Sequence, residues 1–268
     1  MSPDGKHVTV GTKVGDDYAV SVGDLTGASA LRRLTFRGRN RFPIWSADGT
    51  RVTFQSDREG DAGIFWQLAD GTGSTERLTT APEGTSHEPE AWSPSGEHLL
   101  FRVARGPRYS LWGYSLKTRQ AMPFGDVESP IPPNAAFSKD GRWVAYTSRD
   151  ADKFLIFVQP FPPTGAKYQV NEGGIFPVWS PDGHELFYFH GNSEFGAVKI
   201  LQNPVPAPGA STDLWPADLT NASRVEPTED GRFIALIRAE QSPARSVAHL
   251  HVVLNWFEEL EQRLVPGK

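Results

Sequence analysis

The stretch Trp45-Ser46-Ala47-Asp48-Gly49, with the run Thr50-Arg51-Val52-Thr53-Phe54 behind it, decides the fold of this 268-residue chain. We call the five-residue unit, aromatic–Ser–x–Asp–Gly, the anchor. Its other copies are Ser2-Pro3-Asp4-Gly5, Trp92-Ser93-Pro94-Ser95-Gly96, Phe137-Ser138-Lys139-Asp140-Gly141, Trp179-Ser180-Pro181-Asp182-Gly183 and the degenerate Pro227-Thr228-Glu229-Asp230-Gly231. The anchor glycines are 44, 47, 45, 42 and 48 residues apart. This spacing indicates an internal repeat of about 45 residues.

The pattern within each repeat predicts that it forms four short strands. The Asp-Gly pair favours a tight turn, because Gly accepts a positive φ and Asp can bond its own backbone. An apolar or alternating run follows each anchor, then a polar turn, a second run and a weaker third run; residues 143–148, 154–158 and 168–171 are one example. With the strand that leads into the anchor, this pattern is typical of a propeller blade.

The sequence therefore predicts an all-β, six-bladed β-propeller over residues 1–255, followed by a short C-terminal helix and tail over residues 256–268. Residues 256–264 carry apolar side chains at helical spacing and stop before Pro266. The chain begins inside a repeat, and the last repeat shows an anchor strand and the runs 233–238 and 248–256, followed by a helix in place of a fourth strand. We therefore expect the first and last blades to be incomplete, and the chain to be a fragment or short reading frame of a longer propeller protein. Closure would share strands across the chain ends or form a homodimer through the open edge.

Composition excludes several function classes. The net charge of −5 argues against a dedicated nucleic-acid binder. The absence of Cys excludes disulfides, thiolate nucleophiles and Cys-bound metals. No apolar run reaches the length of a membrane span, and the N-terminus shows no signal-peptide pattern.

The repeats resemble the WD40-like "PD40" repeats of TolB-type propellers. The resemblance is closest to the C-terminal propeller region of bacterial eukaryotic-like serine/threonine kinases of acidobacterial type. The segments that carry it are Asp140–Ser148, Val158–Pro162, Gly173–Tyr188 and Val252–Leu260. The chain has no Gly-rich loop, catalytic His-Arg-Asp or Asp-Phe-Gly, so no kinase domain is present in it. The resemblance implies a binding or sensing role, and a periplasmic or extracytoplasmic location.

The loops that lead into the innermost strands hold the candidate site residues. In a propeller these loops surround one mouth of the central channel, and loops on a rigid scaffold commonly carry binding. The ligand-binding candidates are Arg39, Arg41, Asn134, Glu172 and Arg224. His87, Glu88 and Glu90 are the candidates for holding a divalent cation that activates water, with Glu172 as a further carboxylate. The same groups can instead form a hydrated, mixed-charge rim that recognises a peptide, and their spacing matches no fixed metal-ligand motif.

Other reactive side chains have structural alternatives. His249 and His251 share one face of a predicted strand, but a metal pair needs a third ligand. Recurrence of the anchor Asp in most repeats favours turn formation over metal binding. No Gly-x-Ser-x-Gly elbow supports a serine nucleophile. The arginines at 32, 33, 37, 39 and 41 form either a site for a phosphate or carboxylate ligand or a solvated loop.

Two functions follow from these residues. The preferred one is a non-enzymatic binding or sensor module, without a cofactor, that presents its channel mouth to a protein, peptide or small ligand. The alternative is a metal-dependent hydrolase, such as a lactonase, esterase or phosphotriesterase, with a divalent cation in the channel mouth.

Overall fold

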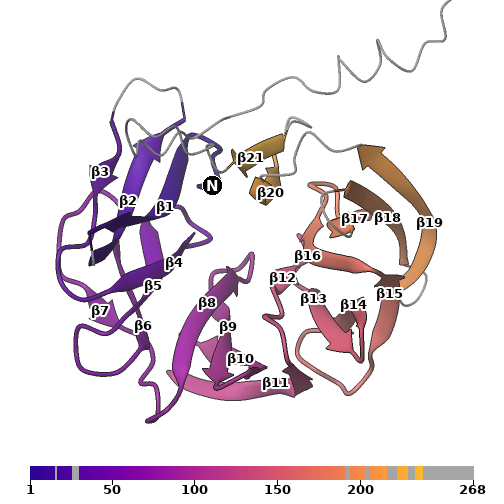
Figure 1. The fold of residues 1–268 in the computed structure, drawn as a ribbon, viewed down its shortest axis with the longest axis horizontal. Coiled ribbons are helices and arrows are strands. Elements are labelled where there is room, and N and C mark those ends of the chain that lie inside the picture. The colour runs from indigo at the N-terminus through magenta and orange to yellow at the C-terminus, as the bar shows by residue number, and fades with distance from the viewer. Residues whose placement is uncertain are drawn as a thin grey trace, which may run out of the picture.

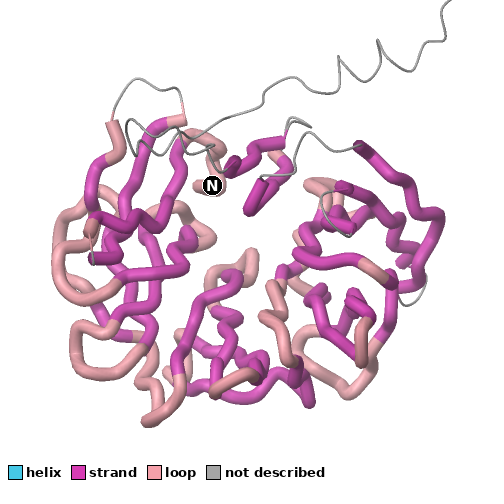
Figure 2. The backbone as a smooth tube through the Cα atoms, viewed as in Figure 1, coloured by secondary structure: helices cyan, strands magenta, loops and turns pink. Residues whose placement is uncertain are grey.

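The computed structural model describes residues 1–15, 17–25, 30–190, 194–202, 206–215, 222–228 and 233–237. These residues form six antiparallel sheets joined by turns and loops, and none of them lies in a helix (Figure 2). Within these ranges no helix is long and apolar enough to cross a membrane. The all-β architecture is confirmed. The predicted helix at 256–264 and the predicted strand at 248–256 lie outside the described residues.

The sheets follow one another in chain order, and four of them are the predicted four-stranded units. The first sheet contains β1 (His7–Val14), β2 (Asp17–Asp24) and β3 (Arg32–Arg33). The second contains β4 (Asn40–Trp45), β5 (Arg51–Ser56), β6 (Gly63–Leu68) and β7 (Glu76–Arg77). The third contains β8 (Ser86–Trp92), β9 (His98–Arg105), β10 (Arg108–Ser115) and β11 (Gln120–Ser129). The fourth contains β12 (Ala136–Phe137), β13 (Trp143–Asp150), β14 (Lys153–Pro160) and β15 (Tyr168–Glu172). The fifth contains β16 (Gly174–Trp179), β17 (Glu185–His190), β18 (Glu194–Gln202) and β19 (Pro206–Trp215). The last described sheet pairs β20 (Ala222–Pro227) with β21 (Phe233–Ile237).

The sheets are arranged radially around a central opening, with β4, β8, β12, β16 and β20 nearest the centre (Figure 1). Apolar clusters join each sheet to the next along the chain. They contain fully buried large side chains such as Phe54, Phe101 and Tyr146. Burying one such side chain contributes about 1.5–3 kcal/mol, so the contacts between sheets are the main source of stability.

The anchors whose residues are all described form closed hydrogen-bonded turns. In the copy at 137–141, Ser138 Oγ donates to Asp140 Oδ1 at 2.6 Å and accepts the backbone N–H of Trp143 at 3.0 Å. Gly141 has a φ of 71° and donates its N–H to the Ser138 carbonyl at 2.9 Å. The copies that begin at Ser2, Ser46 and Ser180 repeat this pattern. The Asp therefore builds the turn, as the recurrence of the anchor predicts.

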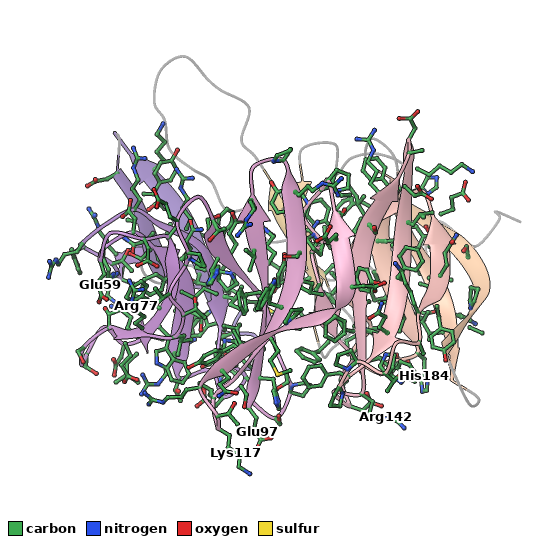
Figure 3. All side chains as sticks on the ribbon, turned by 90° about the horizontal axis from the view of Figure 1, so that it is seen from below. Glu59, Arg77, Glu97, Lys117, Arg142 and His184 are labelled. Atoms are coloured by element: carbon green, nitrogen blue, oxygen red, sulfur yellow. The ribbon has the colours of Figure 1, made fainter. Side chains whose placement is uncertain are left out.

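The anchors in the described part of the chain lie on one face of the molecule, which we call the anchor face. Glu97, Arg142 and His184 each directly follow an anchor glycine, and they lie along the same edge in Figure 3. Consecutive anchors are close together: a Cβ placed on Gly49 would lie 3.4 Å from Pro3 Cδ, and a Cβ on Gly141 would lie 3.4 Å from Pro94 Cδ. The loops that enter the inner strands are at the other ends of these strands, on the opposite face.

Candidate functional site

A cavity of about 1030 Å³ lies at the centre of the ring of sheets. Its wall is mainly apolar. The apolar lining includes Phe42, Pro43, Ile44, Pro89, Ala91, Ala135, Ala136, Phe137, Phe176, Pro177, Val178, Trp179, Phe189 and Val225. The charged lining residues are Asp4, Lys6, Glu90, Arg102, Lys139 and Glu226. A large apolar cavity with a few polar groups is typical of a small-molecule or cofactor site.

Three inner-wall residues have a left-handed backbone. Phe42, Asn134 and Phe176 have φ values of 52°, 49° and 55°, and each lies four residues before an anchor serine. The pairing of β4 with β5 and of β16 with β17 is interrupted at the two phenylalanines by a shift of register. A non-Gly residue in this region costs roughly 1–2 kcal/mol. Despite that cost, both phenyl rings remain partly solvent-accessible, at 38% for Phe42 and 40% for Phe176.

Arg102 on β9 holds Glu88 and Glu90, two of the three carboxylates that the sequence offers for a metal. Its Nε donates to Glu88 Oε2 at 2.5 Å, and its Nη1 donates to Glu90 Oε1 at 2.7 Å. Burial alone would lower the pKa of Arg102, but the charges and hydrogen bonds of Glu90 and Glu88 outweigh it and raise that pKa. The second oxygen of Glu90 accepts the backbone N–H of Ala135 at 3.1 Å, and the guanidinium lies 5.0 Å from the centre of the Phe42 ring. Arg102 and Glu90 therefore connect the second, third and fourth sheets at the channel wall.

His87 lies on the other side of β8 and does not join Glu88 and Glu90. Its Nδ1 is 2.9 Å from Thr79 Oγ1, and its ring packs against Phe101 at 5.0 Å. Burial lowers the pKa of His87 to about 4, although the charge of Asp61 opposes this shift. Successive side chains of a strand point to opposite faces, which separates His87 from Glu88. In the described ranges no three His, Asp or Glu side chains are grouped so that they can hold a metal ion.

The other predicted binding residues are dispersed. Asn134 lines the cavity, and its Nδ2 donates to the Pro132 carbonyl at 2.9 Å. The guanidinium of Arg41 lies 3.9 Å from the centre of the Tyr18 ring, against the first sheet. Arg39 is exposed. Glu172 is also exposed, at the end of β15, where it forms an ion pair with Lys153 at 2.7 Å. Arg224 belongs to β20, and its side chain is outside the described part of the structure.

Of the eight predicted site residues, the cavity wall contains Glu90 and Asn134. The residues that the sequence analysis missed are Phe42, Phe176 and Arg102. The two phenylalanines carry a readable signal: both occur as Phe-Pro, four residues before an anchor serine. Arg102 carries none, because it lies inside an apolar run that is typical of a core strand.

Comparison with known proteins agrees with this architecture. No protein family model matches the chain. The chain is 30% identical over 155 residues to a Bacillus subtilis protein named "uncharacterized peptidase YuxL". The aligned segment covers 56% of this chain and 22% of that protein. The chain thus spans only a part of this relative.

Solved structures with the same fold include TolB from Acinetobacter baumannii, with 20% identity, 74% of this chain and 50% of that chain covered, and a TM-score of 0.59. A putative TolB from Agrobacterium tumefaciens has 16% identity, covers 80% and 78% of the two chains, and has a TM-score of 0.63. A puromycin-hydrolyzing peptidase of Mycobacterium tuberculosis has 18% identity, covers 85% and 42%, and has a TM-score of 0.57. The fold is therefore that of a TolB-like β-propeller. At these identities the likeness concerns the fold alone, since one fold carries many functions.

Proposed function

We propose that this chain is a non-enzymatic binding module that takes a protein, peptide or small ligand at the mouth of its central channel. The observation that carries the proposal is the chemistry of the channel wall. The wall is apolar, it exposes Phe42 and Phe176, and its buried carboxylate Glu90 is hydrogen-bonded to Arg102 and to the backbone of Ala135. Apolar surface favours binding, whereas carboxylates engaged in this way are poorly placed for acid–base work.

The alternative is a metal-dependent hydrolase with a divalent cation in the channel mouth. It would require Glu88 and Glu90 to leave Arg102, and His87 to leave Thr79 and the apolar cluster around Phe101. Each change exposes or unpairs a buried group, which costs free energy. The geometry therefore supports the binding module better.

A screen with a blocked channel tests the proposal. Val178 lines the cavity, so Val178→Arg places a long charged side chain in the channel. Met122 is 67% exposed on the outer strand β11, so Met122→Arg adds the same side chain away from the channel. We expect compounds or peptides that raise the melting temperature of the wild type to lose this effect with Val178→Arg and to keep it with Met122→Arg.

The same protein samples test the hydrolase alternative. Elemental analysis measures any bound metal, and ester, lactone and phosphoester substrates are assayed with and without a chelator. We expect no metal-dependent turnover of these substrates. Turnover that a chelator abolishes and that returning the metal restores would overturn the proposal. So would a ligand set that binds the Val178→Arg variant as well as the wild type.

A further inference from the structure

The two strained phenylalanines face the same cavity from opposite directions. Phe42 lies on β4 and Phe176 on β16, and these strands stand on opposite sides of the central opening (Figure 1). Their repeat positions are equivalent, so the rings reach the channel at corresponding points of their strands. A phenyl ring could be buried by an ordinary strand backbone, yet both residues adopt a left-handed conformation and remain partly exposed. Strain of this kind is concentrated at functional sites.

We infer that the channel binds an uncharged small molecule with an aromatic ring, which stacks on the exposed rings of Phe42 and Phe176. This inference rests on the proposed binding function and names the class of ligand. Aromatic rings attract one another in stacked or edge-to-face arrangements at short centroid distances. Each of the two partly exposed phenyl rings on the cavity wall offers such a contact.

Each ring also contacts a neighbouring side chain. The guanidinium of Arg102 lies 5.0 Å from the centre of the Phe42 ring. The Phe176 ring meets Phe189 edge to face, with centroids 6.3 Å apart and planes at 86°. Arg102 is held by two carboxylates and Phe189 is buried, so the side chains that contact the two rings are in place before a ligand binds. A pre-formed site of this kind loses less entropy when a ligand binds.

The wall beside the two rings favours an aromatic group over a sugar or an ion, whereas Asp4, Lys6, Lys139 and Glu226 line other parts of the same cavity. Around the two rings the wall presents Pro43, Ile44, Pro177 and Val178, which offer no side-chain hydrogen bonds. A sugar would leave most of its hydroxyl groups without partners in such surroundings, and that loss is costly. The nearby charges of Arg102 and Glu90 already pair with each other, so a charged ligand finds no unpaired counter-ion in this pair.

The experiment measures displacement of phenylnaphthylamine, an uncharged fluorescent aromatic probe, from the full chain. Benzyl alcohol and cyclohexylmethanol serve as competitors, because they have the same number of heavy atoms and differ in the aromatic ring. The variants are Phe42→Asn and Phe176→Asn, since Asn134 shows that asparagine fits this repeat position with the same φ. The control is Phe36→Asn, whose ring is 74% exposed outside the cavity.

We expect saturable probe binding that benzyl alcohol displaces at lower concentration than cyclohexylmethanol. Loss of one stacking partner should weaken binding on the order of tenfold in either channel variant. The Phe36→Asn control should bind like the wild type. Melting temperatures of the two channel variants should not fall, because asparagine tolerates the left-handed region better than phenylalanine does.

Three results would overturn the inference: no probe binding by the wild type, equal displacement by the two alcohols, or channel variants that bind as tightly as the control. The Val178→Arg variant separates this failure from failure of the binding function. If Val178→Arg abolishes probe binding and the phenylalanine variants still bind the probe, the channel is the site but Phe42 and Phe176 do not hold the ligand. Probe binding that also survives Val178→Arg counts against the channel itself.

Discussion

Replacing Arg102 by methionine removes the positive charge that two buried carboxylates share. The Glu88 residue is 9% exposed, and the Glu90 side chain is 6% exposed. Removing one partner of a buried ion pair costs about 3–5 kcal/mol, because the remaining charge has no compensation. The carboxylates keep two neutral partners, the Ser86 hydroxyl at 3.1 Å from Glu88 and the Ala135 N–H at 3.1 Å from Glu90. We therefore expect the lower end of this range, about 3 kcal/mol.

Thermal unfolding followed by circular dichroism measures this loss. For a chain of this size, each kcal/mol shifts the melting temperature by about 2–4 °C, so Arg102→Met should melt roughly 6–12 °C below the wild type at pH 7.

Two further variants separate charge from packing. Arg102→Lys keeps the charge but loses the planar fork that reaches both carboxylates, so its melting temperature should lie between those of wild type and Arg102→Met. Adding Glu88→Gln and Glu90→Gln to Arg102→Met leaves no unpaired charge and should recover most of the loss. A deficit below about 1 kcal/mol, or one that the two glutamine substitutions do not reduce, would refute the role of Arg102 as the shared counter-ion.

Three other predictions concern the turns and the buried histidine. Ser138→Ala removes two hydrogen bonds of one anchor and should lower the free energy of unfolding by about 1–2 kcal/mol in urea titrations. The pKa of Asp140 is lowered: burial raises it, but the hydrogen bonds from Ser138 and from the Arg142 backbone outweigh burial. Its stabilising contribution is therefore complete above about pH 4 and is lost as the pH falls further; Asp140→Asn should show a shallower acid-induced decline, and an identical one would contradict this role. His87 has a folded pKa of about 4 against an ordinary 6.5, so the unfolded chain takes up the proton first and stability falls between pH 6.5 and pH 4. His87→Gln should flatten the pH dependence of the melting temperature in that interval.

The repeat made the fold predictable from the sequence. Ser138, Asp140 and Gly141 form their turn through bonds within six residues of chain, so the local sequence contains all the information that the turn needs. The four-stranded units follow, because each strand pairs with its neighbour in the sequence. Local contacts of this kind are what sequence patterns report.

The site was less predictable, because it depends on which side of a strand each residue faces. His87 and Glu88 are adjacent in the sequence but point to different sides of β8. The partner of Glu88 is Arg102, on the next strand, and the register of β8 with β9 decides that pairing. A register shift also decides that Phe176 reaches the channel, although its run of apolar residues is typical of a buried strand.

The close approach of consecutive anchors has a consequence for how such a chain can change by gene duplication. The third anchor residue lies against the glycine of the following anchor at Pro3 and Gly49 and at Pro94 and Gly141. The third residue of the next anchor is Lys139, and the glycine that follows it in the next repeat, Gly183, has no atom within 4 Å of a Cβ placed on it. Whether a repeat packs well in the ring therefore depends on the sequence of the repeat after it as well as on its own sequence. Copying or exchanging one unit creates a new pair of neighbours, and a Cβ in place of the glycine hydrogen at such a junction would touch the preceding proline at van der Waals distance. We expect duplications that keep a proline or alanine before each receiving glycine to be accepted more readily than those that break this pairing.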